Sequence, residues 1–167
     1  FPTRRSSDLE GFGGSISLEE QSSGLVTDSI FASNSAGSYG GAVTILESNL
    51  EFNNVTFSDN TCVNGGAIHF EDSTDLMITE TSFNNNSASY GGAVVLLNAT
   101  GSFTSVAFRD NSALFEAGGC YLEDSSLALM HGDFQGNSAS LGGCFELLNS
   151  TLTADNTDLS DSSSLQS

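Results

Sequence analysis

The stretch Phe83-Asn-Asn-Asn-Ser-Ala-Ser-Tyr-Gly-Gly-Ala-Val94 decides the fold, because its pattern returns four more times along the chain. The skeleton is Phe-x-x-Asn, a short spacer, and then Gly-Gly followed by a small and an apolar residue. The Phe positions are 31, 57, 83, 108 and 134, and Gly-Gly pairs begin at 13, 40, 65, 91, 118 and 142. Steps of 24–27 residues indicate a protein built from stacked, repeated units.

One repeat shows how a single unit is built. Val43 and Ile45 lie on either side of Thr44 and share one face, and residues 50–52 and 55–57 alternate in the same way, with polar bends between the three segments. Apolar residues therefore recur at every second position and not at the helical period of 3.6. We predict an all-β fold, a right-handed parallel β-helix with about six coils of 24–27 residues and three short strands per coil. Leucine-rich repeats need a different consensus, and propeller blades need about 40 residues or more.

Side chains of one kind recur at the same point of each repeat, so we expect them to stack in columns. The Phe column is expected inside the stack, where each buried ring contributes roughly 1.5–3 kcal/mol. The Asn column is expected at a bend, with amides bonded to the coils above and below. Gly-Gly is expected to form a sharp corner. The Asn column is Asn34, Asn60, Asn86, Asn111 and Asn137; the small residues after Gly-Gly are Ala42, Ala67, Ala93, Cys120 and Cys144; the next apolar positions are Val43, Ile68, Val94, Tyr121 and Phe145.

The composition suggests three segments. Residues 1–9 resemble the translation of a sequencing adapter, and we exclude them from fold reasoning as non-native. Residues 10–159 are expected to form the β-helix repeat domain, as a fragment of a longer protein. Residues 160–167 form a Ser-rich tail that is expected to fray.

The charge of the chain excludes several classes of partner. The net charge is −18, and residues 10–167 contain 20 acids and a single basic residue, Arg109. Nucleic-acid binding needs Lys and Arg to neutralise phosphates, so we predict none. Anionic membrane surfaces should repel the chain, and no apolar run reaches the eighteen or so residues of a spanning helix, so we predict no membrane insertion of this segment.

The histidines and cysteines give no catalytic pattern. His69 is expected at an outward strand position and His131 near a bend, both as ordinary surface residues. Cys62, Cys120 and Cys144 replace small residues of the repeat and are expected to behave as buried apolar groups. Cys120 and Cys144 should be stacked neighbours, but strand spacing of about 4.8 Å would separate their Cβ atoms too far for an unstrained disulfide.

A column of acids and amides is expected at the bend after the first strand of each coil. Its members are Glu47, Glu71, Asp72, Glu123 and Asp124, with Asn98 and Asn149 in line. Such a column predicts at most weak Ca²⁺ binding through oxygen ligands, and no recognised calcium motif is present. Arg109 is expected beside the Phe column, away from these acids. We therefore predict no catalytic, cofactor-binding or metal-binding residues. Glycosylation sequons occur at Asn54, Asn85, Asn98 and Asn149, and they can also arise by chance in an Asn-rich chain.

The pairing of Phe-x-x-Asn with Gly-Gly-Ala-(Ile/Val) resembles the double motif of the polymorphic outer membrane protein repeats of chlamydiae. The motifs here begin at Phe31 with Gly40, Phe57 with Gly65, and Phe83 with Gly91, and the last two pairs carry Gly-Gly-Cys instead. The resemblance implies an exported autotransporter passenger that is extracellular, displayed on a cell surface and adhesive. Its implied partner is a protein or glycan on a host or neighbouring cell.

Two functions follow as hypotheses. The first is a non-catalytic surface adhesin or scaffold, whose contacts would be made by outward residues such as Thr44, Glu47, His69 and Asp72. The alternative is a fragment of a pectate-lyase-like or polygalacturonase-like enzyme, because such enzymes use the same pectin-lyase-like fold. Long loops that build a cleft would favour the enzyme, whereas every repeat here has 24–27 residues.

Overall fold

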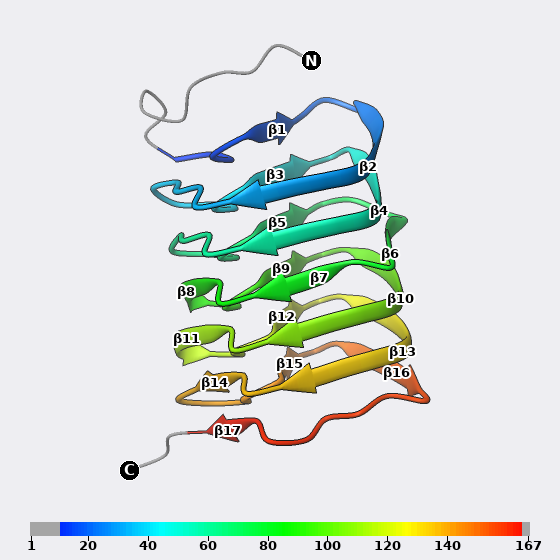
Figure 1. Ribbon diagram of the computed structural model, residues 1–167. Coiled ribbons are helices and arrows are strands. Elements are labelled where there is room, and N and C mark those ends of the chain that lie inside the picture. Colours follow the sequence, from blue (N-terminus) through cyan, green and yellow to red (C-terminus); the bar gives the residue numbers. More distant parts are fainter. Residues whose placement is uncertain (1–10, 165–167) are drawn as a thin grey trace.

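The chain winds into a stack of coils in the computed structural model, which describes residues 11–164 (Figure 1). Every pairing between its named strands is parallel, and the described residues contain no helix. Residues 26 apart, such as Ser23 and Asn49, therefore lie side by side. The predicted all-β parallel β-helix is confirmed.

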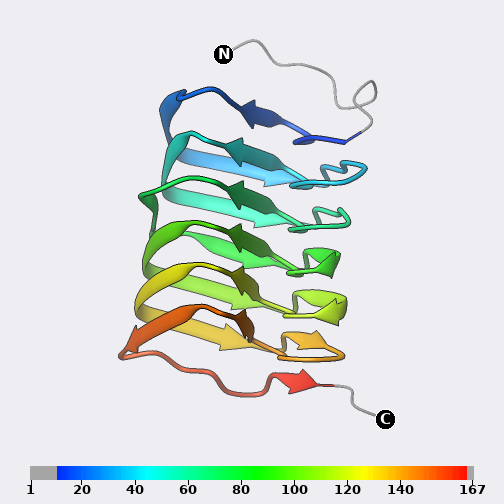
Figure 2. The ribbon, with the colours of Figure 1, turned by 180° about the vertical axis from the view of Figure 1, so that it is seen from behind.

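Three sheets form the sides of the stack. The first sheet lies at the back in Figure 1 and faces the viewer in Figure 2. Its order is β1 (Ile16–Leu18), β3 (Val43–Leu46), β5 (Ile68–Glu71), β9 (Val94–Leu97), β12 (Cys120–Glu123) and β15 (Phe145–Leu148). The second has the order β16 (Thr151–Asp155), β13 (Ser126–Gln135), β10 (Thr100–Arg109), β6 (Leu76–Thr79), β4 (Asn49–Ser58) and β2 (Ser23–Ala32), and β7 (Ser82–Asn84) pairs with β4 and β10. The third has the order β17 (Ser163–Ser164), β14 (Ser138–Ala139), β11 (Ser112–Glu116) and β8 (Ser87–Tyr90).

The division of a coil into strands differs from the prediction in one respect. The expected strands at 50–52 and 55–57 belong to one long strand, β4, which bends at Asn54, where φ is +54°. Asn tolerates this left-handed conformation better than most residues, so the ladder continues through the bend. The third sheet instead comes from the segment before Gly-Gly, which the repeat pattern presents only as a spacer.

The interior of the stack contains the expected Phe column. The rings of Phe57 and Phe83 are parallel with centroids 5.0 Å apart, and those of Phe83 and Phe108 are 4.4 Å apart. Phe31 stacks above and Phe134 below, at 4.9 and 4.5 Å from their neighbours. These rings are at most 9% exposed, so the column forms the centre of one continuous apolar core.

The Asn column lies at the corner between the second and third sheets, partly buried at Asn34 and fully buried from Asn60 to Asn137. The side-chain amide of Asn86 donates to Oδ1 of Asn111 at 2.9 Å and to the Phe57 carbonyl at 3.1 Å. Its own Oδ1 accepts from the backbone N–H and the side-chain amide of Asn60, at 3.0 and 2.9 Å. The same side-chain bond joins each successive pair from Asn34 to Asn137. The column thus satisfies polar groups that would otherwise be costly to bury.

The predicted register around Cys120 is wrong by one residue. Cys120 pairs with Val94 and Phe145, and Tyr121 pairs with Val95 and Glu146. Gly119 therefore takes the position of Ala93, because the Ala93 and Val94 amides both donate to its carbonyl. The left-handed corner that Gly40, Gly65, Gly91 and Gly142 occupy in other coils is held here by Ala117, with φ at +55°.

The predicted segments at the two ends of the sequence, residues 1–9 and 160–167, lie wholly or partly outside the described residues. Residues 1–9, taken as non-native, lie outside the described residues. The chain continues beyond residue 159 into β17, which runs parallel to β14 through the pair Ser138 and Ser163. The last three residues of the expected tail, 165–167, also lie outside the described range.

Candidate functional site

A polar strip runs down the corner between the first and second sheets. At each coil one exposed residue adopts φ between +47° and +51°: Glu47, Asp72, Asn98, Asp124 and Asn149. Asp and Asn accept this conformation because their short side chains bond locally. The Asn98 amide donates to Asp72 Oδ1 at 2.7 Å, and the Asn149 amide donates to Asp124 Oδ1. We call these five residues, with the three-residue turns that they begin, the corner strip.

The predicted acid column is therefore confirmed for five of its members and wrong for two. Glu71 and Glu123 lie one residue earlier, at the ends of β5 and β12, and Leu97 lies between them in the ladder. The first strand of the coil runs one residue further than the sequence suggests, so these two carboxylates remain on the sheet. Glu71 and Glu123 are two coils apart and form no pair.

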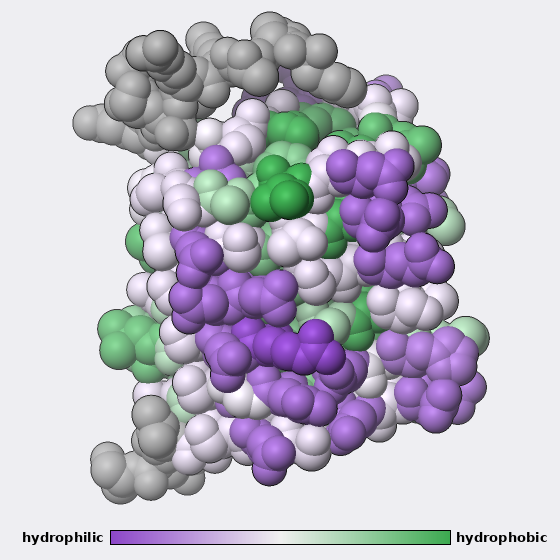
Figure 3. Space-filling view, in the orientation of Figure 1, coloured by the Kyte–Doolittle hydropathy of each residue, from purple (hydrophilic) through white to green (hydrophobic). Residues whose placement is uncertain are grey.

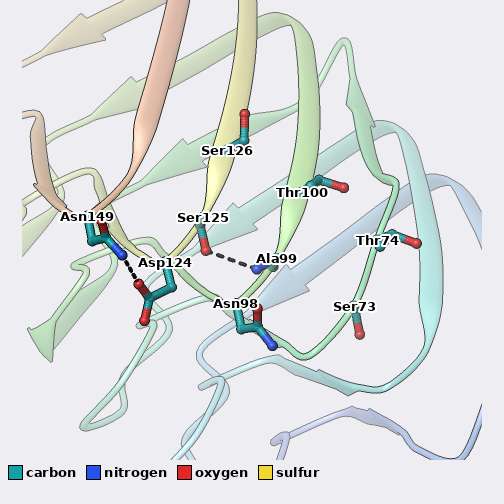
Figure 4. A pocket seen from close by; sticks show the side chains of 9 residues that line it. All are labelled: Ser73, Thr74, Asn98, Ala99, Thr100, Asp124, Ser125, Ser126 and Asn149. Atoms are coloured by element: carbon teal, nitrogen blue, oxygen red, sulfur yellow. Dashed lines mark hydrogen bonds between the residues drawn. The ribbon is translucent and has the colours of Figure 1, made fainter.

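Within the corner strip, beneath its exposed bend residues, lies a column of serines that sequence reasoning missed. Ser48, Ser73, Ser125 and Ser150 each follow a bend residue, and their hydroxyl oxygens accept backbone N–H groups from the coil above at 2.9–3.1 Å. Figure 4 shows one such bond, from the Ala99 amide to Ser125 Oγ. The signal in the sequence is a Ser that recurs at steps of 25 or 26 residues, interrupted by Ala99, in a chain where Ser is common.

Two shallow hollows follow the corner strip. The first is shown in Figure 4 and is lined by Ser73, Thr74, Asn98, Ala99, Thr100, Asp124, Ser125, Ser126 and Asn149. The second lies towards β2 and is lined by Gln21, Ser22, Ser23, Glu47, Ser48, Asn49, Asp72, Ser73 and Thr74. Hydroxyl, amide and carboxylate groups occur in the lining of both, so the strip can exchange hydrogen bonds with a polar ligand lying along it. No group of three or more His, Cys, Asp or Glu side chains is placed to hold a metal ion within residues 11–164. Weak Ca²⁺ binding stays an untested prediction.

His69 is buried, which corrects its expected place on the surface. Its side chain is 0% exposed, its Nε2 lies 2.8 Å from Glu71 Oε2, and the ring centroid lies 4.6 Å from that of Tyr39. Thr44, also expected to be exposed, is buried and donates its hydroxyl to the Tyr39 carbonyl at 2.8 Å. Both side chains do point outward from the first sheet, but the segment before Gly-Gly packs across them. Burial lowers the pKa of His69, and the hydrogen bond and charge of Glu71 oppose this effect.

The remaining polar candidates are exposed. His131 is exposed as expected, and its Nδ1 lies 2.7 Å from the Asn156 amide nitrogen. Arg109, at the end of β10, forms an ion pair with Asp133. The four sequon residues Asn54, Asn85, Asn98 and Asn149 are all exposed and have φ between +47° and +54°.

The three cysteines are free thiols. Cys120 is fully buried in the core, whereas Cys62 and Cys144 are partly buried. Burial raises the pKa of each thiol, which suppresses the thiolate form that nucleophilic chemistry requires. The expected apolar role is confirmed for Cys120, although it occupies the Val94 position and not the Ala93 position.

Parallel coils with stacked Phe and Asn columns define a β-solenoid, and comparison with protein families identifies its type. The chain matches the family described as "Right handed beta helix region" over residues 4–161, and it belongs to this family. Comparisons with curated proteins and with solved structures find no match. Within the described residues, no helix is long and apolar enough to cross a membrane.

Proposed function

We propose that this chain is a non-catalytic, extracellular β-helix region that presents binding surfaces to a protein or glycan on another cell. The uninterrupted repeat carries the proposal. The corner residues 47, 72, 98, 124 and 149 follow each other at steps of 25 or 26, so no coil inserts a loop beside the corner strip. Binding and catalytic residues are commonly placed on such loops, which a cleft around a polysaccharide would need.

The chemistry of the corner strip also favours binding over hydrolysis. Hydrolysis of a glycosidic bond uses two carboxyl groups that flank it. Here Asp72 and Asp124 lie two coils apart, and each accepts a hydrogen bond from an Asn side chain on the next coil. Of the four residues expected to contact a partner, Glu47 and Asp72 are exposed and keep this role. Thr44 and His69 are buried, so we no longer propose that they contact a partner. In more detail, we propose that the chain is part of an autotransporter passenger similar to the chlamydial polymorphic outer membrane protein repeats, and that it is displayed on a cell surface.

The test uses the purified chain labelled with a fluorophore. We expect saturable binding to at least one type of animal or bacterial cell, or to a glycan on an array, and a loss of binding in the Asp72→Asn, Asp124→Asn double variant if the corner strip makes the contact. Absence of binding to every surface would reduce the proposal to an inert spacer. Release of reducing ends or unsaturated products from pectic polysaccharides would overturn it in favour of the enzyme.

A further inference from the structure

One coil departs from the regular stack at the edge of the third sheet. Ala113 pairs with Ala88 and Glu116 pairs with Tyr90, so two residues of β11 stand opposite one residue of β8. The extra residue makes a β-bulge, which re-aims side chains. The two bulged residues, Leu114 and Phe115, are 62% and 46% exposed.

The bulge is held in place by its neighbours. The Ser140 hydroxyl donates to the Leu114 carbonyl at 2.7 Å, and the Leu141 amide donates to the Phe115 carbonyl at 2.8 Å. The ring of Phe115 lies 5.4 Å from that of Tyr90, and Leu141 is itself 37% exposed. We call Tyr90, Leu114, Phe115 and Leu141 the apolar knob. In Figure 3 a hydrophobic cluster projects from the left edge at the height of β11.

Carboxylates lie next to the apolar knob. Tyr121, whose ring lies 6.3 Å from that of Tyr90, donates its hydroxyl to Glu123 Oε2 at 3.1 Å. Glu146 pairs with Tyr121 in the strand ladder, and Glu116 pairs with Tyr90. Burial, the hydrogen bond to Glu123 and the charges of these carboxylates raise the pKa of Tyr121. Arg109 is the only Lys or Arg in the described residues, and it is paired with Asp133.

We propose that the apolar knob and its carboxylates dock a basic, amphipathic segment of a partner protein. An aliphatic or aromatic side chain of the partner would pack on Leu114 and Phe115, and its Lys or Arg side chains would lie towards Glu116 and Glu146. This inference rests on the proposed binding function and names its partner class. Charge complementarity selects the occupant, because a second copy of the chain would carry the same net charge of −18 and repel the first.

The experiment measures fluorescence anisotropy of labelled peptides with the full chain at physiological ionic strength. The probe is a short peptide with alternating Lys and Leu. One matched peptide replaces each Leu by Ser, and another replaces each Lys by Glu. We expect the Lys–Leu peptide to bind at least about tenfold more tightly than the Lys–Ser peptide, because burial of one aliphatic side chain is worth roughly that factor. The Glu–Leu peptide should not bind.

Variants locate the site. Leu114→Ser with Phe115→Ser should abolish the advantage of the Lys–Leu peptide, and Glu116→Gln should weaken binding of both cationic peptides. Leu25→Ser with Ile30→Ser is the matched control, because these side chains of β2 are 57% and 75% exposed on another sheet. The control should bind like the wild type, and circular dichroism should show that all variants keep their β structure.

Three results would overturn the inference: equal binding by the knob variant and its control, equal binding of Lys–Leu and Lys–Ser peptides, or binding of the Glu–Leu peptide. Self-association that the knob variant abolishes in sedimentation would assign the surface to a second copy, and neutral oligosaccharide binding lost in that variant would assign it to a glycan. Peptide binding without any cell binding would leave this inference standing and remove the proposed function. If the knob variant still binds cells as the wild type does, the proposed function stands and this inference falls.

Discussion

Replacement of Asn86 by Ala tests how much the buried amide column stabilises the stack. The substitution removes four hydrogen bonds and leaves three buried groups without their partner: the backbone N–H of Asn60, one side-chain N–H of Asn60, and the carbonyl of Phe57. Oδ1 of Asn111 still accepts from the backbone N–H of residue 86 at 3.0 Å. Each orphaned group costs about 1–3 kcal/mol. Three such groups give an expected loss of about 3–9 kcal/mol in the free energy of unfolding, a large part of the 5–15 kcal/mol typical of folded domains.

The assay is urea unfolding followed by circular dichroism and by tyrosine fluorescence, whose agreement checks that the transition is two-state. Asn84→Ala is the matched control, two residues earlier in β7, because its side chain makes one bond of 3.3 Å to Ser82 at a partly exposed position. The control should change stability by no more than about 0.5 kcal/mol. A loss below about 1 kcal/mol for Asn86→Ala, or equal losses for both variants, would refute the reasoning that the column carries buried, unreplaced hydrogen bonds.

Two further predictions concern single side chains. His69→Val, which copies Val95 in the next coil, should remove a pH-dependent part of the stability. Burial lowers the pKa of His69 in the folded state, so the unfolded chain takes up the proton first as the pH falls. The difference in the free energy of unfolding between wild type and variant should therefore shrink below about pH 6.5, by at most about 1.4 kcal/mol per pH unit. Urea midpoints between pH 7.5 and 5 measure this difference, and a flat difference would contradict it. Ala99→Ser should raise the free energy of unfolding by about 1 kcal/mol, because its hydroxyl would supply the Ser73 amide with the acceptor that the other coils have. A urea midpoint below that of the wild type would contradict the serine column.

The parts of the fold that follow from the sequence are those in which one residue type repeats at one period. Phe57 and Phe83, or Asn60 and Asn86, stack because identical side chains at equal spacing satisfy each other best when the coils are in register. The register at Cys120 was missed for a physical reason. Ala117 accepts the left-handed corner that glycine holds elsewhere, so Gly118-Gly119 is not equivalent to the other Gly-Gly pairs.

The candidate site was predictable in outline only. The exposed Asp and Asn of the corner strip were expected as a column because their spacing matches the repeat. The burial of His69 was not, because alternation shows which way a strand side chain points but not whether another segment covers it; here Tyr39 does. The exposed pair Leu114 and Phe115 was also missed, since a bulge depends on the partner strand as well as on its own sequence.

The central claim is that each unit of 25 or 26 residues makes one turn of the stack, and contacts between Phe rings test it most directly. In the protein with isotopically labelled Phe, nuclear Overhauser spectra should connect the rings of Phe57 with Phe83 and of Phe83 with Phe108, whose centroids lie 5.0 and 4.4 Å apart, and should show no direct contact between Phe57 and Phe108. Absence of both neighbouring contacts, or a contact between rings two coils apart, would contradict the stacked arrangement.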